Sequence, residues 1–239
     1  MHRTHGFQCP LDIRQVLVWF LCIFPFLVFY FLCFPVLTGE IRSFLHYLFL
    51  FFYLAGIIMF FIATSTNHRF PSQFDINQGV YCRFCQVFVH PNAKHCRSCN
   101  RCRMDFDHHC KYINNCVTSE NYSYFFYGTM SLIVSSVTCI VAVVYLGKSY
   151  KSDPIGVINI LQQRYKRTIT SSLFWVLYGA SVLINLGLLV PLLILLVFHV
   201  FFQKRGITTY NFLMEEVSKE PLNSINILCI SSGPQIHQV

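Results

Sequence analysis

The chain has 239 residues and a formal net charge of +8, yet only 12% of its residues are charged while 54% are hydrophobic. A soluble globular domain has about 25% charged residues, so the composition excludes an ordinary water-soluble protein. The positive charge suits a chain that faces anionic lipid head groups, and no nucleic-acid partner is needed to explain it.

Four apolar segments are long enough to cross a bilayer as helices. They cover residues 16–37, 44–63, 123–146 and 172–202. The first is too long for the apolar part of a cleaved signal peptide and lacks a small-residue cleavage site, so we interpret it as a signal anchor. The fourth is longer than a bilayer requires, and we expect it to tilt or to bend at Pro191.

These segments divide the chain into five parts, with no internal repeat expected. The parts are a cytosolic N-terminus (1–15), helices one and two (16–63), a cysteine-rich insert (64–122), helices three and four (123–202) and a C-terminal tail (203–239). Four spans put both termini and the insert on one side of the membrane. That side carries 12 of the 18 Lys and Arg residues, so the positive-inside rule predicts that it faces the cytosol.

The insert has seven cysteines and four histidines between residues 82 and 116. In the reducing cytosol such clusters are more often metal sites than disulfides. Two C-x-x-C pairs, Cys82 with Cys85 and Cys96 with Cys99, can each give two thiolates to one ion. We expect two structural zinc ions, each contributing about 10–16 kcal/mol of apparent folding free energy. The predicted fold class is an all-α integral membrane protein with four transmembrane helices and a cytosolic two-zinc insert between helices two and three.

Spacing alone does not assign every ligand. Pairing each C-x-x-C with the nearest histidine and a later cysteine gives two sets: Cys82, Cys85, His95, Cys102 and Cys96, Cys99, His109, Cys116. His90 is then a surface histidine, while His108 and Cys110 are left over for chemistry. In extended chain, residues two apart face the same side, and Asp107 is placed to hold the imidazole in one tautomer.

The sequence Asp-His-His-Cys at 107–110, within this frame, resembles the DHHC family of protein S-acyltransferases. The similarity runs over about residues 82–126 and includes the C-x-x-C pairs, Asn-Asn-Cys at 114–116, and Asn121. The layout of four spans with the insert between the second and the third agrees with that family. The resemblance implies a protein S-palmitoyltransferase with two structural Zn²⁺ ions bound by the two ligand sets given above.

The resemblance also implies roles for individual residues. Cys110 takes a fatty acyl group, usually palmitoyl, from acyl-CoA and passes it to a cysteine of a target protein, in a ping-pong reaction. His108 is the general base, Asp107 orients it, and Thr209, in a Thr-Thr pair after span four, supports Asp107. The expected partners are acyl-CoA, substrate proteins with accessible cysteines, and the bilayer, in a multi-pass protein of the secretory pathway (endoplasmic reticulum or Golgi).

Two further sets of residues are assigned from physical arguments. Basic side chains near the nucleophile are candidates for contacts with CoA phosphates, with a solvated basic face as the alternative: Arg97, Arg101, Arg103 and Lys111. The acyl chain should leave water, since each buried CH₂ contributes about 0.8 kcal/mol. It is expected between the four helices, with Ser135 or Ser136 at the floor of the pocket or in ordinary helix packing.

Three departures from the family pattern keep a second interpretation open. Tyr112 stands where the family usually has Trp, Thr118 replaces a Gly, and Asn211 replaces the acid after the Thr-Thr pair. A Thr at a position of positive φ would be strained. The alternative is therefore a membrane adaptor that keeps the zinc module for protein binding and has lost turnover. A metal-dependent hydrolase is disfavoured because four protein ligands fill each zinc site.

The other cysteines and histidines receive simpler interpretations. Inside the spans, cysteines act as small apolar fillers: Cys22, Cys33 and Cys139. In the termini, Cys9 and Cys229 are either acylated or plain free thiols. His46 and His199, near span ends, are expected at the membrane interface and not in catalysis. With only these two histidines in the spans, a transporter or channel is disfavoured.

Overall fold

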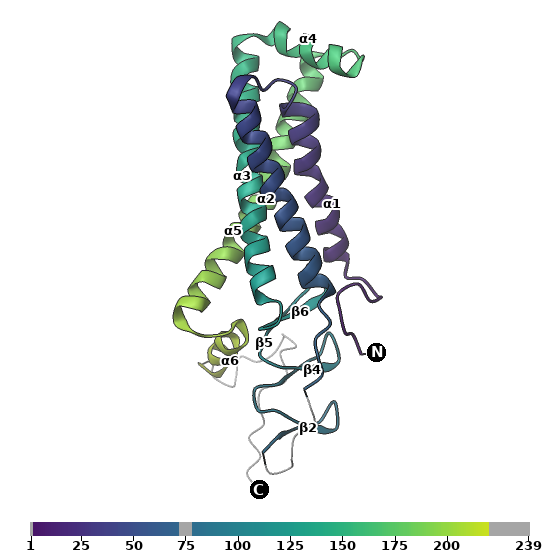
Figure 1. Ribbon diagram of the computed structural model, residues 1–239, viewed down its shortest axis with the longest axis vertical. Helices are drawn as coiled ribbons and strands as arrows, with labels where there is room; N and C mark the ends of the chain where they lie inside the picture. The colour runs from purple at the N-terminus through teal and green to yellow at the C-terminus, as the bar shows by residue number, and fades with distance from the viewer. Residues whose placement is uncertain (1, 72–77, 220–239) are drawn as a thin grey trace.

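The computed structural model describes residues 2–71 and 78–219 (Figure 1). Within these residues, four helices have the length and composition of membrane spans. They are α1 (Ile13–Leu27) with its wider-turn continuation η1 (Val28–Cys33), α2 (Gly39–Ser65), α3 (Tyr122–Ser152) and α5 (Ser171–Arg205). Two shorter helices are α4 (Pro154–Tyr165) and α6 (Thr209–Lys219). The four predicted spans and the insert between the second and the third are confirmed.

Local sequence explains where several helices begin and end. The Asp12 side chain accepts a hydrogen bond from the Arg14 backbone N–H at the start of α1, and Thr170 does the same for Leu173 at the start of α5. Helix α5 ends at Arg205, and the next residue, Gly206, has a φ of 62°, a conformation that glycine adopts without strain. These caps satisfy backbone groups that a helix end otherwise leaves without partners.

Helix α3 is the centre of the bundle. In its apolar window 56% of the residues are buried, against 22–28% in the other three spans. It packs closely on α2 because two positions lack side chains: a Cβ on Gly56 would lie 2.7 Å from Leu132, and one on Gly128 would lie 2.9 Å from Phe60. Outward-facing positions are large and apolar, as in Phe51, which is 67% exposed. Such a surface is stable in lipid.

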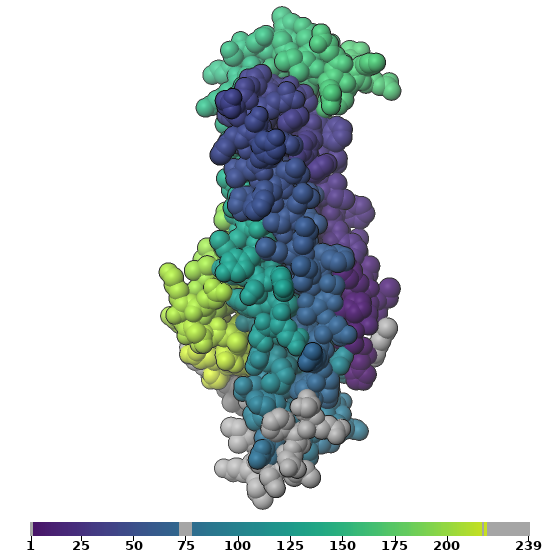
Figure 2. All heavy atoms as spheres, viewed as in Figure 1, coloured from purple at the N-terminus to yellow at the C-terminus, as the bar shows by residue number. Residues whose placement is uncertain are grey.

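Helix α5 runs beside the bundle at the α4 end and leans away from it toward the insert (Figure 1). Pro191 lies inside this helix and cannot donate the backbone hydrogen bond to the residue four positions earlier. Figure 2 shows the elongated body that results, with α4 across one end, the insert at the other and α6 on the flank. The first span ends at Cys33, short of the predicted 37, and Pro35, two residues further on, has no backbone N–H to continue the helix.

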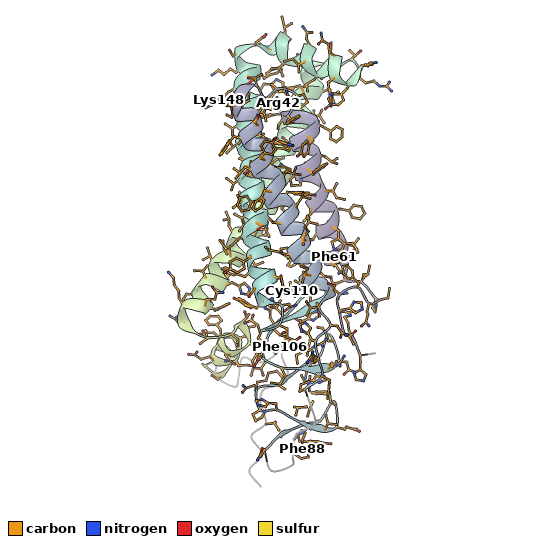
Figure 3. All side chains as sticks on the ribbon, viewed as in Figure 1. Arg42, Phe61, Phe88, Phe106, Cys110 and Lys148 are labelled. Atoms are coloured by element: carbon orange, nitrogen blue, oxygen red, sulfur yellow. The ribbon has the colours of Figure 1, made fainter. Side chains whose placement is uncertain are left out.

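In residues 78–118 the insert forms three two-stranded antiparallel sheets. The strand pairs are β1 (Val80–Cys82) with β2 (Val87–Val89), β3 (Lys94–Cys96) with β4 (Arg101–Arg103), and β5 (Phe106–Cys110) with β6 (Asn115–Thr118). The third pair lies nearest the helices, and Figure 3 shows Cys110 at this junction and Phe88 at the far end. The Asn115 amide fixes the junction by donating to the carbonyls of Ala63 and Thr64 in the last turn of α2, at 3.2 Å each.

Residues 2–12, which we call the N-terminal strap, lie against the insert. The backbone N–H of Arg3 donates to the Cys99 carbonyl at 2.9 Å, and that of Gly6 donates to the Thr64 carbonyl at 2.8 Å. The Arg3 guanidinium also donates to the side chain of Asn114. The predicted separate N-terminus is therefore packed on the chain that carries the cysteines.

Candidate functional site

The three hairpins repeat every 14 residues. Their first strands end at Cys82, Cys96 and Cys110, and their second strands begin at Val87, Arg101 and Asn115. The cross-strand pairs follow the same offset: Tyr81 with Phe88, His95 with Cys102, His109 with Cys116. So do three turn residues with φ of 56°, 50° and 51°: Gln86, Asn100 and Asn114. The expectation of no internal repeat was therefore wrong. The repeat is hard to see in the sequence because only a few turn and ligand positions recur at the 14-residue interval, among otherwise different residues.

The repeat brings together the two ligand sets that spacing suggested. Cys82, Cys85, His95 and Cys102 form one cluster, and Cys96, Cys99, His109 and Cys116 form the other. In the first, the His95 Nδ1 lies 3.6, 3.4 and 3.8 Å from the three sulfurs, and in the second His109 Nδ1 lies at the same three distances from its sulfurs. A zinc tetrahedron with Zn–S bonds of about 2.3 Å and Zn–N bonds of about 2.0 Å has edges of about 3.5–3.8 Å.

Both clusters therefore fit a four-coordinate zinc ion with three thiolates and one imidazole, a donor set typical of structural sites. Each of the first two hairpins gives its C-x-x-C to one site, and the hairpin that follows completes that site with a histidine and a cysteine. His90 belongs to neither cluster. Bound zinc would link each hairpin to the next, and so would fix the third hairpin, which carries Asp107, His108 and Cys110.

Cys110 stands in the third hairpin where Cys82 and Cys96 stand in the first two, but Ile113 occupies the place of the second cysteine. Among the described residues, no cluster of potential metal ligands includes Cys110. Its side chain is buried in an apolar cluster with Ala63 at the end of α2 and Phe125 in the first turn of α3. The repeat thus yields a cysteine that is positioned like a zinc ligand but belongs to neither ligand cluster.

Asp107 and His108 lie beside this thiol. The His108 Nδ1 and the Asp107 Oδ2 are 2.7 Å apart, and Cys110 hydrogen-bonds the same imidazole. Burial opposes a charged imidazole, but the bonds to Asp107 and Cys110 raise the pKa of His108 to about 9. Burial also acts to raise the pKa of Asp107, yet bonds from His108 and Thr209 hold it below its ordinary value. An imidazole held beside a sulfur in this way is positioned to exchange a proton with it.

Thr209 contacts Asp107 with two groups. Its backbone N–H donates to Asp107 Oδ1 at 3.0 Å, and its hydroxyl donates to Oδ2 at 2.8 Å. These bonds join the start of α6 to β5, across about a hundred residues of sequence. They leave the carboxylate fully engaged, so that it is held in one orientation toward His108.

Sequence reasoning missed His199, which was expected at the membrane interface. It lies in the part of α5 that follows Pro191 and is buried. The centroid of its ring is 5.4 Å from that of His108 and 5.2 Å from that of Phe125. Its Nδ1 is 3.0 Å from the hydroxyl of Tyr122. A signal was present, since an ionisable side chain inside a predicted span marks functional positions.

The basic residues proposed for CoA phosphates lie in different environments. Arg103 is fully buried and donates to the backbone carbonyls of His68, Arg3 and Thr4, so it binds the N-terminal strap and is not placed to meet a ligand. This corrects the expectation for Arg103. Lys111 is exposed at the junction.

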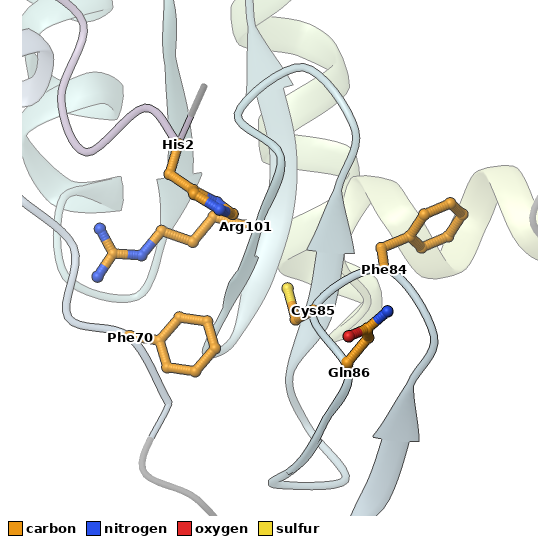
Figure 4. A pocket seen from close by; sticks show the side chains of 6 residues that line it. All are labelled: His2, Phe70, Phe84, Cys85, Gln86 and Arg101. Atoms are coloured by element: carbon orange, nitrogen blue, oxygen red, sulfur yellow. The ribbon is translucent and has the colours of Figure 1, made fainter.

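Arg97 and Arg101 lie near the aromatic rings of a surface pocket. The Arg97 guanidinium is 5.7 Å from the Phe84 ring, and the Arg101 guanidinium is 5.5 Å from the Phe70 ring. Figure 4 shows the pocket, of about 360 Å³, with Arg101 and the two rings on its walls. Arg101 lines this pocket, whereas Arg97 and Cys110 are not among its lining residues.

The three departures have different structural outcomes. Thr118 has no positive φ, so the expected strain is absent. Its buried hydroxyl lies 3.1 Å from the His68 Nδ1. Tyr112 is 50% exposed. Asn211 is exposed in α6, where its backbone N–H donates to the Thr208 hydroxyl.

Comparison with known proteins identifies the same region. The family model described as DHHC palmitoyltransferase matches residues 75–216, more than half of the chain. The chain is 31% identical over 151 residues to "Probable protein S-acyltransferase 20" of Arabidopsis thaliana, a match that covers 60% of this chain and 21% of the relative. It is 31% identical over 142 residues to "Palmitoyltransferase ERF2" of Kluyveromyces lactis, covering 59% and 35%.

The chain is also 31% identical over 160 residues to "Palmitoyltransferase ZDHHC11" of Homo sapiens, covering 60% of this chain and 38% of the relative. The matched region therefore spans between 21% and 38% of the length of these relatives.

Proposed function

Since the chain belongs to the DHHC palmitoyltransferase family, we propose that it is a protein S-acyltransferase that carries a fatty acyl group from acyl-CoA through Cys110 to cysteines of target proteins. The observation that carries this proposal is the connected series of Thr209, Asp107, His108 and Cys110 at the membrane end of the insert. An oriented imidazole beside a cysteine that belongs to neither ligand cluster is the arrangement that nucleophilic catalysis requires.

In the first step, the Cys110 thiolate attacks the carbonyl carbon of the acyl-CoA thioester. The bond from that carbon to the Cys110 sulfur forms, and the bond to the CoA sulfur breaks. The leaving CoA thiolate accepts the proton of the His108 imidazolium, whose pKa of about 9 keeps it charged near neutral pH. Asp107 holds the imidazole with its other nitrogen toward the sulfur.

In the second step, neutral His108 accepts the proton of a target cysteine. The target sulfur attacks the thioester carbon on Cys110, and the Cys110 thiolate leaves. His108 is again an imidazolium beside a thiolate, so the site returns to its starting state. Zinc ions bound by the two clusters would take no part in these steps and would hold the hairpin that carries the three residues.

The apolar surroundings of Cys110 support a long acyl chain as the transferred group. Cys110 shares a buried apolar cluster with Ala63 of α2 and Phe125 of α3, and Leu195 of α5 packs against that cluster, so an acyl chain attached to Cys110 would leave water for apolar side chains of three helices. Transfer of hydrocarbon from water contributes about 0.8 kcal/mol per CH₂. We propose that this end of the bundle faces the cytosol, in a membrane of the secretory pathway, which agrees with the excess of Lys and Arg on that side.

The test uses detergent-purified full-length protein, labelled palmitoyl-CoA and an acceptor peptide with one cysteine near a hydrophobic anchor. The proposal predicts label on the protein, its transfer to the peptide, and loss of both in Cys110→Ser. His108→Ala should keep two zinc ions and load at least about 100-fold more slowly. Two zinc ions with no label in the wild type would favour the adaptor, in which the module only binds proteins.

A further inference from the structure

His199 and Tyr122 form a second polar pair behind the proposed catalytic base. One side-chain oxygen of Asp107 and one ring nitrogen each of His108 and His199 all lie within 4.8 Å of one another. The rings of His108, His199 and Phe125 contact one another, with centroids 5.2–5.5 Å apart. His199 lies in α5 and Tyr122 is the first residue of α3, so the contact between them joins two membrane helices next to His108.

Ordinary packing does not explain a histidine at this place. His199 is 4% exposed, in a helix that is otherwise apolar around it. A buried polar group without a partner is costly, and an apolar ring of similar size would avoid that cost. Tyr122 supplies the partner, since its hydroxyl lies 3.0 Å from the His199 Nδ1. This bond fixes the rotation of the His199 ring, and the fixed ring limits how the His108 ring can turn.

We propose that His199, oriented by Tyr122, is a positioning residue that holds the imidazole of His108 in the orientation from which it exchanges protons with sulfur. This inference rests on the proposed function. Asp107 bonds only one nitrogen of His108 and leaves the tilt of the ring about that bond open. The His199 and Phe125 rings restrict this tilt, so the nitrogen that faces Cys110 stays aligned through both steps.

The test measures single-turnover loading and the KM for palmitoyl-CoA in variants that keep two zinc ions. His199→Phe retains a ring without nitrogens, and Tyr122→Phe removes only the hydroxyl. We expect loading about tenfold slower in His199→Phe, and a smaller decrease in Tyr122→Phe, with KM changed less than twofold. His199→Asn, which returns a polar group near the Nδ1 position, should recover part of the rate. The double variant should be no slower than His199→Phe, because Tyr122 acts through His199.

A matched pair at the opposite end of the bundle provides the control. The hydroxyl of Tyr30 lies 3.1 Å from the Nδ1 of His46, and His46→Phe or Tyr30→Phe should leave the loading rate unchanged. Wild-type rates in both His199→Phe and Tyr122→Phe would overturn the proposal, as would an increase in KM with an unchanged single-turnover rate. If the wild type itself does not load Cys110, the proposed function fails and not this inference alone.

Discussion

Replacing Thr209 by Val removes one hydroxyl and keeps the size and branching of the side chain. The bond that is lost is the 2.8 Å donation to Asp107 Oδ2, while the backbone N–H still donates to Oδ1 at 3.0 Å. A hydrogen bond to a charged group contributes about 1.5–3 kcal/mol. Because each 1.36 kcal/mol is tenfold in rate, full transmission to the transition state would slow loading by about 10- to 150-fold. With the backbone bond retained, we expect about tenfold.

The assay is single-turnover loading of labelled palmitoyl-CoA, with zinc content measured on the same sample. Thr208→Val is the matched control, since the Thr208 hydroxyl accepts a hydrogen bond from the Asn211 backbone N–H and does not contact Asp107. It weakens the start of α6 without removing the bond to the carboxylate. Equal rates in Thr209→Val and the wild type would refute the orienting role of Thr209. Equal decreases in the two variants would assign the effect to α6 as a whole.

Three further predictions concern the framework of the site. Gly6→Ala should lower the Tm by several degrees, because the new Cβ would lie 2.1 Å from the Ile113 carbonyl oxygen and overpacking costs about 1–3 kcal/mol; an unchanged Tm would mean that the N-terminal strap is not packed as described. Ile113→Cys should recreate a C-x-x-C pair with Cys110, so that micromolar Cd²⁺, a soft ion, blocks loading of the variant while the wild type still loads; equal sensitivity would contradict the repeat. Removing zinc with a chelator should abolish loading and leave the helical circular dichroism signal largely intact, since each site contributes about 10–16 kcal/mol to folding of the insert alone; full loading without zinc would contradict the structural role of the metal.

The sequence predicted the spans well because lipid imposes a length and an apolar composition on each helix. Boundaries were less accurate at the polar ends, where α3 continues to Ser152 and α5 to Arg205, beyond the apolar runs. Ligand spacing grouped the eight potential zinc ligands as the structure does, because two-residue gaps within a hairpin leave few ways to surround one ion.

Contacts between residues far apart in sequence were not predictable in the same way. A lone arginine in a basic hairpin looks like a solvent-exposed cation, but Arg103 is covered by the N-terminal strap, which lies about 100 residues away in the chain. His199 depends on the course of α5 past Pro191 to reach His108. The expectation for Thr118 depended on backbone geometry, and its hydroxyl instead joins a network with His68. The interpretation of Cys229 lies outside the described residues.

The central claim is that Cys110 is the residue that carries the acyl group. The most direct measurement is mass spectrometry of peptides from wild-type protein incubated with palmitoyl-CoA, with and without hydroxylamine. The account predicts a palmitoyl thioester on the peptide containing Cys110, removed by hydroxylamine and absent from Cys110→Ser. A palmitoyl group found on other cysteines while Cys110 remains a free thiol, in protein that retains two zinc ions, would contradict it.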